Sequence, residues 1–131
     1  MRKQRWIRRA AQRGMTLVEI MIVVAIIGMV VGGVAYGAFN QFERAKVQNT
    51  KKEVATIKGA IEIWSTQNVG QTLTSLDQLF KEKLLNKDPK DPWAQPYQFK
   101  CPGEHDTDSC DVWSNGKDKK AGTTDDITSW K

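Results

Sequence analysis

The chain starts with a polar, basic head and continues into a long apolar segment. Residues 1–14 are mostly polar, whereas residues 15–39 are almost continuously apolar. Twenty-five helical residues extend about 37 Å, which is more than the thickness of about 30 Å of a bilayer hydrocarbon core. The pattern therefore predicts a transmembrane helix over residues 15–39.

Four glycines lie within this apolar segment at the spacing of two small-xxx-small pairs. They are Gly28, Gly32, Gly33 and Gly37. Glycine is common in ordinary membrane helices, and it also permits close helix packing or local unwinding. The sequence leaves both interpretations open.

The apolar pattern changes its period beyond residue 39. Over residues 40–68 apolar side chains recur at steps of three and four, which is typical of an amphipathic helix with one buried face. The stripe consists of Val47, Thr50, Val54, Ile57, Ile61 and Trp64. Because no proline lies between Met15 and Asn68, we expect one continuous helix about 80 Å long.

Residues 69–131 are richer in loops. Ser75 with Gln78 three residues later predicts a capped short helix that ends by Asn86. Its buried side chains are expected to be Leu76, Leu79, Phe80 and Leu84. Three prolines between residues 88 and 97 predict an irregular segment, and residues 95–100 and 111–114 predict the strands of a hairpin. The predicted fold class is α+β.

Charge is concentrated in the basic head. The formal net charge is +5, and six of the 20 basic residues lie in the first fourteen positions. Without this head, 14 basic residues face 15 acidic ones, a balance of −1. A basic chain suggests a nucleic-acid partner. Since the basic character belongs to the head, nucleic-acid binding is not predicted for the rest of the chain.

The basic head also predicts an orientation. Basic residues mark the cytoplasmic side of a membrane helix, so the residues after Phe39 are expected beyond the inner membrane. An ordinary secretory signal has the same basic start and apolar middle. However, this apolar run is longer than the core of such a signal, and no small-residue cleavage site follows it.

Glu19 interrupts the apolar segment. A charged carboxylate near a bilayer costs about 2.5 kcal/mol or more, so such a residue usually has a partner. A membrane anchor with a chance acidic residue is the simplest alternative. Gly14, followed by Met15-Thr16-Leu17-Val18-Glu19 and a long apolar helix, resembles the leader junction of the type IV pilin-like family.

This resemblance implies a processing and assembly site. In that family a prepilin peptidase cuts after the glycine and methylates the new amino terminus, which implies cleavage after Gly14 and methylation of Met15. The family glutamate pairs with the amino terminus of a neighbouring subunit, so the resemblance makes Glu19 the assembly carboxylate. The family more often has phenylalanine where this chain has Met15.

The segment DPWAQPY, residues 91–97, is similar to a DPWGNPY-like segment of one branch of this family, the major (G-type) pseudopilins of type II secretion. Membership would imply a pilin-like fold in which the long helix packs on a small hairpin and loop domain. It would also imply a homopolymer that works with minor pseudopilins and an inner-membrane assembly platform with a cytoplasmic ATPase.

On this resemblance the chain divides into four segments. Residues 1–14 are a leader that is removed, and residues 15–39 span the membrane and drive assembly. Residues 40–68 continue the helix, and residues 69–131 form a periplasmic globular region. The expected location is the bacterial inner membrane, with one pass, followed by a filament in the periplasm.

Cys101 and Cys110 lie near the turn end of the predicted hairpin. An exported domain can oxidise its cysteines, and closing a loop of fewer than fifteen residues contributes up to about 3 kcal/mol. We therefore predict a disulfide. The alternatives are a metal site or a redox pair, but their usual spacings, such as Cys-x-x-Cys, are absent from this pair.

Residues 113–127 are rich in acids, glycine and threonine but poor in apolar residues. Such a loop is mobile by itself, and a hard cation such as Ca²⁺ orders oxygen-rich loops. The segment lacks the spacing of an EF-hand, yet it resembles the calcium loop of major pseudopilins. A solvated acidic turn is the alternative.

The resemblance implies a structural calcium ion bound by the carboxylates of Asp118 and Asp126. Backbone carbonyls near Trp113, Asn115 and Thr123 would complete the ligand set. The chain departs from the family pattern by placing Lys117, Lys119 and Lys120 in the same loop.

Catalysis finds little support in the sequence. The only histidine, His105, lies among acidic residues of the predicted hairpin without a paired nucleophile, and we expect it to be a solvated loop residue. The predicted function is therefore that of a pseudopilin whose filament pushes folded proteins through the outer membrane. The alternatives are a type IV pilin of a surface fibre for adhesion, motility or DNA uptake, and a membrane-tethered periplasmic module that does not polymerise.

Overall fold

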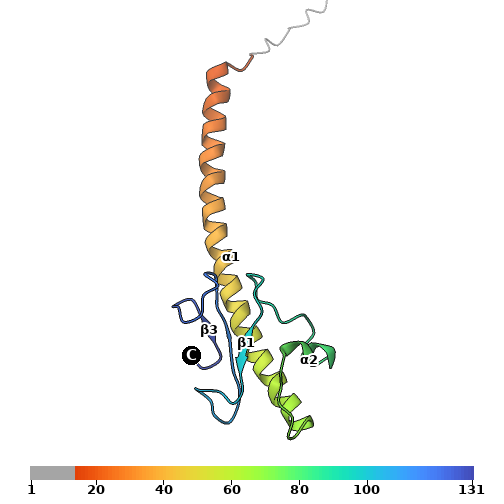
Figure 1. The fold of residues 1–131 in the computed structure, drawn as a ribbon. Helices are drawn as coiled ribbons and strands as arrows, with labels where there is room; N and C mark the ends of the chain where they lie inside the picture. The colour runs from red at the N-terminus through yellow and green to blue at the C-terminus, as the bar shows by residue number, and fades with distance from the viewer. Residues whose placement is uncertain (1–13) are drawn as a thin grey trace, which may run out of the picture. The chain divides into compact units, whose positions relative to one another are not determined.

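A computed structural model describes residues 14–131, and most of the basic head, residues 1–13, lies outside the described residues. The first element is α1, Leu17–Gln67, a single helix of 51 residues (Figure 1). The predicted helix over 15–68 is confirmed, with the start two residues later and the end one residue earlier. Gly14 to Thr16 form a short non-helical lead to it.

The chain divides into two compact units, Met1–Phe39 and Asn40–Lys131. The described part of the first unit is the amino-terminal part of α1, and its large apolar side chains are exposed all around the helix, as Val18, Ile27 and Met29 illustrate. By length and composition, α1 is the one helix within residues 14–131 that could cross a membrane. Such a surface requires apolar surroundings.

The second unit is built on one face of α1. This face buries Thr50, Val54, Ile57, Ala60, Ile61 and Trp64, with Val47 packed at its margin. The predicted apolar stripe is therefore confirmed. The remaining core side chains come from loops and short elements: Leu73, Leu76, Leu79, Leu85, Tyr97, Cys110, Val112 and Ile127.

The second helix, α2, is Leu76–Lys81. Ser75 caps it as predicted, because its side chain accepts a hydrogen bond from the Asp77 amide. The helix ends well before Asn86, where the prediction had placed its limit. The chain turns at Glu82 and Lys83, whose φ of 59° is incompatible with a continuing right-handed helix.

A small antiparallel sheet completes the fold. It consists of β1 (Gln98–Lys100), β2 (Asp111–Ser114) and β3 (Ile127–Thr128), in the order β1-β2-β3. In its register Phe99 faces Val112, and Ser114 faces Ile127. Figure 1 shows β1 and α2 beside the carboxyl-terminal part of α1. The predicted α+β arrangement of a long helix on a hairpin is confirmed.

Two details of the sheet differ from the prediction. The first strand starts at residue 98 rather than 95, because Pro96 lacks an N–H group and forms only an isolated bridge with Lys90. The third strand was not predicted. It is two residues long, and so short a strand leaves no alternation to recognise in the sequence.

Candidate functional sites

Glu19 is engaged by its own chain. One carboxylate oxygen accepts hydrogen bonds from the Thr16 amide at 2.8 Å and from the Thr16 hydroxyl at 3.1 Å. The Glu19 amide in turn donates to the Thr16 hydroxyl oxygen at 3.3 Å. This reciprocal pattern is a capping box, which satisfies backbone donors at the start of a helix. The T-x-x-E signal of this cap is present in the sequence at Thr16 and Glu19, but the cap was not predicted.

Gly14 and Met15 precede this capped turn. Both are exposed, and a Cβ atom added to Gly14 would meet nothing within 4 Å. The peptide bond between them lies outside the helix, where its backbone is not committed to helical hydrogen bonds. The predicted cleavage point therefore sits next to the cap that holds Glu19.

Cys101 and Cys110 form a disulfide, as predicted. The bridge closes the segment 101–110, which is called the hairpin loop below. Inside it the Gly103 amide donates to the Ser109 carbonyl at 2.9 Å. The loop is thus fixed both by a covalent bond and by its own backbone.

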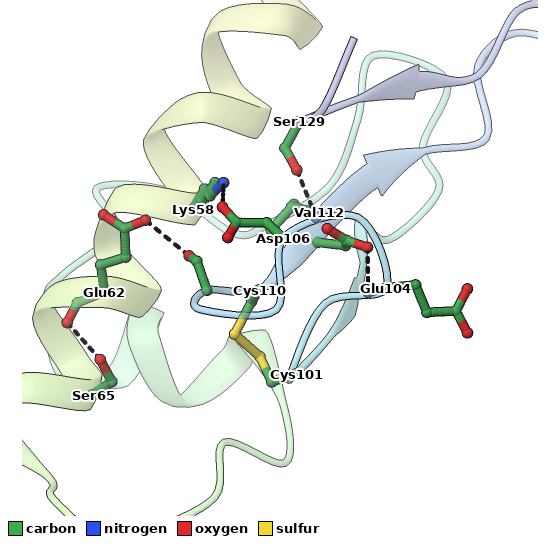
Figure 2. Close-up of a disulfide and its surroundings, with 11 residues drawn as sticks. Lys58, Glu62, Ser65, Cys101, Glu104, Asp106, Cys110, Val112 and Ser129 are labelled. Carbon is green, nitrogen blue, oxygen red and sulfur yellow. Dashed lines mark hydrogen bonds and ion pairs between the residues drawn. A yellow bond between two sulfur atoms is a disulfide. The ribbon is translucent and has the colours of Figure 1, made fainter.

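The hairpin loop is also fastened to α1. Lys58 donates to Asp106 at 2.6 Å, and the Ser109 hydroxyl donates to Glu62 at 2.9 Å. Figure 2 shows the Asp106 carboxylate turned towards Lys58 beside the disulfide. This ion pair raises the pKa of Lys58 and lowers the pKa of Asp106, since each charge favours the other.

His105 is half-exposed in the hairpin loop, as predicted, and its exposed ring also belongs to a cluster that was not predicted. The ring of His105 stacks on Trp130 with centroids 4.1 Å apart, and its Nδ1 lies 3.1 Å from Asp111. The buried Asp111 carboxylate also accepts the amides of Glu104 and His105. Burial disfavours its charged form, but these hydrogen bonds outweigh burial and hold the pKa of Asp111 below its ordinary value.

The DPWAQPY segment is organised by Asp91, which is only 5% exposed. Its carboxylate accepts the amides of Trp93 at 3.0 Å and Gln95 at 2.8 Å. The other carboxylate oxygen accepts the hydroxyl of Ser114 in β2 at 2.6 Å. The prolines correctly predicted an irregular segment, but the ordering role of Asp91 was not predicted from the sequence.

The carboxyl-terminal loop, residues 115–126 between β2 and β3, also uses its carboxylates as hydrogen-bond acceptors for its own backbone. Asp125 accepts the Asp118 amide at 2.9 Å, and Asp126 accepts the Gly122 amide at 2.7 Å. The Thr123 hydroxyl lies 2.7 Å from Asp125 and 3.2 Å from Asp126. The Thr123 hydroxyl and the Asp118 amide hold the pKa of Asp125 below its ordinary value, so its carboxylate stays charged.

The two carboxylates predicted to bind calcium both accept backbone amides of this loop: Asp118 accepts the Lys120 amide at 2.8 Å, and Asp126 accepts the Gly122 amide. Within residues 14–131 no three His, Cys, Asp or Glu side chains are grouped as metal ligands, so backbone and amide oxygens would have to contribute. The side-chain Oδ1 of Asn115 is buried and has no hydrogen-bond partner among these residues. Trp113 lies in β2, with its ring at an edge-on angle to Trp130. Asp125, which the prediction omitted, accepts a hydrogen bond from the Asp118 amide.

The carboxyl-terminal loop contacts the start of the second unit. Lys117 lies 3.8 Å from Glu43 on α1, and Glu43 also accepts Lys46 at 3.1 Å. Lys46 holds the pKa of Glu43 below its ordinary value, and Lys117 adds to the effect. Trp93 and Asp125 line the same cleft of about 410 Å³. The loop and the DPWAQPY segment therefore meet α1 at one place.

These features define a class of protein. A helix with an exposed apolar half, a capped glutamate in its first turn and a small disulfide-bonded α+β domain are the features of a pilin-like subunit. The fold is similar to the crystal structure of the major pseudopilin from the type 2 secretion system of enterohaemorrhagic Escherichia coli. The TM-score is 0.54 at 19% identity, over 70% of this chain and 87% of that chain.

Sequence comparisons identify the branch. The family model for type II secretion system protein G matches residues 38–130, and a model for the prokaryotic N-terminal methylation motif matches residues 9–35. The chain is 33% identical to the type II secretion system core protein G of Escherichia coli K12 over 91% of both chains. It is 32% identical to that of Pseudomonas aeruginosa, over 94% of this chain and 98% of the relative.

This chain therefore belongs to the protein G family of type II secretion systems. The prediction of a major pseudopilin is confirmed. The comparisons favour it over the two alternatives, a surface pilin and a tethered periplasmic module.

The contacts of Asp91 generate a stability prediction. Asp91→Ala leaves the Ser114 hydroxyl and two backbone amides without their acceptor, so we expect the free energy of unfolding to fall by about 3 kcal/mol or more. Asp88→Ala is the matched control, because Asp88 is exposed and its one ion pair among residues 14–131 is with Lys90. Chemical denaturation followed by tryptophan fluorescence measures both. Equal stability of the two variants would contradict the role given to Asp91.

Proposed function

We propose that this chain is the repeating subunit of a periplasmic pseudopilus that helps to move folded proteins through the outer membrane. The single observation that carries the proposal is the form of α1. Its first part is apolar on every side, and its second part carries a folded domain on one face. A subunit of this form can be stored in the membrane and then packed into a filament through the same apolar surface.

The proposal includes processing at the amino terminus. A prepilin peptidase cuts after Gly14 and methylates Met15, with the domain from residue 40 onward in the periplasm. The match of residues 9–35 to the methylation motif and the non-helical backbone at Gly14 support this step. Minor pseudopilins and an inner-membrane platform with a cytoplasmic ATPase are the proposed assembly partners, and the chain acts as a structural subunit rather than as an enzyme.

Assembly is proposed to use Glu19. In the single chain this carboxylate already accepts two hydrogen bonds from Thr16, which lowers the cost of placing it in an apolar segment. Cleavage after Gly14 creates a positive amino group on Met15. In the filament, the Glu19 carboxylate of one subunit pairs with that amino group on its neighbour.

We also propose a structural calcium ion in the carboxyl-terminal loop. The residues suit a hard cation, because the loop offers carboxylate and carbonyl oxygens and includes the unpartnered Asn115 Oδ1. Asp118 and Asp126 would hold the ion with backbone carbonyls of Trp113, Asn115 and Thr123. The bound ion would neutralise the carboxylates and fix the loop, while Lys117, Lys119 and Lys120 would weaken its binding.

Processing is tested by intact-mass measurement on the chain purified from cells that contain active prepilin peptidase. We expect the loss of residues 1–14, one added methyl group on Met15, and two hydrogens fewer than the reduced form because of the disulfide. Gly14→Ala provides the control, since it should keep the leader. An intact leader on the unaltered chain would reject the proposed processing.

Assembly is tested by two substitutions of Glu19. Glu19→Ala removes both the charge and the cap, whereas Glu19→Gln keeps hydrogen-bond acceptors for Thr16 but removes the charge. If the ion pair drives assembly, both variants should be cleaved yet yield at least about tenfold fewer filaments by electron microscopy. Normal filaments from Glu19→Gln would show that the cap, and not the charge, is what matters.

Calcium binding is tested by thermal unfolding of the full chain in detergent. At a saturating concentration, about 100 times the dissociation constant, calcium adds about 2.7 kcal/mol, so Tm should rise by several degrees. Asp126→Ala should abolish this rise, and Asp108→Ala, in the hairpin loop, should keep it. The absence of any calcium response in the unaltered chain would reject the site.

A further inference from the structure

The hairpin loop carries three carboxylates. One of them is paired with α1 of the same subunit, and the other two are not. Asp106 is committed to Lys58 on α1. Asp108 is exposed and makes no ion pair among the described residues, and Glu104 pairs only with the exposed Lys100. Glu104 and Asp108, called the acidic tip below, therefore face outward from a loop held rigid by the disulfide and by α1.

On the face of α1 that holds the hairpin loop, basic residues recur at a regular spacing. Lys58, Lys51 and Arg44 are separated by steps of seven residues. Seven residues are close to two helical turns, so the three side chains lie on nearly one face at intervals of about 10.5 Å. Lys58 donates to the Asp106 carboxylate of the hairpin loop within the subunit, whereas Lys51 and Arg44 are exposed and have no ion-pair partner among residues 14–131.

A groove lies along this face. It has a volume of about 320 Å³ between α1 and the carboxyl-terminal strand. Three lysines, Lys51, Lys58 and Lys131, and one acidic residue, Glu62, line it, and Glu62 accepts the Ser109 hydroxyl. A Cβ atom added at Gly59 would meet nothing within 4 Å, so the groove has free space over the helix. This groove, called the basic groove below, offers positive charge and room for a side chain from outside the subunit, and Arg44, which lines a separate cleft, adds a further positive charge along α1.

We propose that the acidic tip of one copy of this chain docks in the basic groove of the next copy, with Asp108 and Glu104 facing Lys51 and Arg44. The docking rests on the proposed filament, which places copies side by side. If the next copy is displaced along the helix axis, its Lys51 or Arg44 lies at the height of Lys58 in the first copy. An acidic tip can then meet a basic side chain of the neighbouring copy. The two surfaces differ, so the contact is head-to-tail, and in the open filament proposed above it repeats from copy to copy.

Exposed ion pairs of this kind are individually weak and are screened by salt. Their repetition at every subunit contact lets them fix the register of neighbours that the apolar helices hold together. The filament yield of the unaltered chain should therefore fall as the ionic strength rises.

Charge reversal tests the docking in the full chain, produced with its secretion machinery and scored by electron microscopy of filaments. Arg44→Glu with Lys51→Glu, or Glu104→Lys with Asp108→Lys, replaces attraction by repulsion at every contact. We expect each pair to lower filament yield by about tenfold. All four changes together restore opposite charges, so most of the yield should return.

The control pair is Lys81→Glu with Lys83→Glu, exposed lysines near α2 that lie outside both surfaces, and it should leave the yield unchanged. Thermal unfolding confirms that each variant is folded. Unchanged filaments from both reversed pairs, or no recovery in the fourfold variant, would overturn the docking alone. Absence of filaments from the unaltered chain would overturn the proposed pseudopilus and the docking with it.

Discussion

The second unit depends on the burial of one stripe of α1. The rest of that unit contains a six-residue helix and strands of three, four and two residues, none of which could fold alone. Their side chains, such as Leu79 and Val112, are fully buried against the face that carries Val54 and Ile57. The short elements are therefore stabilised by packing on α1. The positions of the apolar residues on this helix determine where the loops can pack.

Where regular structure is missing, buried carboxylates take over the hydrogen bonding of the backbone. Asp91 holds the DPWAQPY segment and ties it to β2, and Asp111 holds the start of the hairpin loop. Each accepts several donors, so the charge is balanced by directed N–H and O–H groups. Asp125 and Asp126 do the same in the carboxyl-terminal loop. The loops of this small domain are thus ordered by their acids as much as by apolar packing.

The long helix, its buried stripe, the Ser75 cap and the disulfide could be predicted because periodicity and spacing encode them locally. The limits of β1, the presence of β3 and the end of α2 could not, since they depend on Pro96, on a two-residue pairing and on the turn at Lys83. The roles of Asp91 and His105 depend on contacts with Ser114 and Trp130, which lie more than 20 residues away. Glu19 was recognised by its motif, but its partner Thr16 was visible in the same motif and was missed.

The capped turn at Thr16 and Glu19 has a consequence for the energetics of a proposed filament. Because the carboxylate is already satisfied in the isolated chain, joining a neighbour exchanges one set of hydrogen bonds for another instead of rescuing a bare charge. In the proposed filament the net gain per contact would then be small, and the exchange could run in either direction. Filament length would accordingly respond to the supply of subunits, and retraction would release monomers that remain stable in the bilayer.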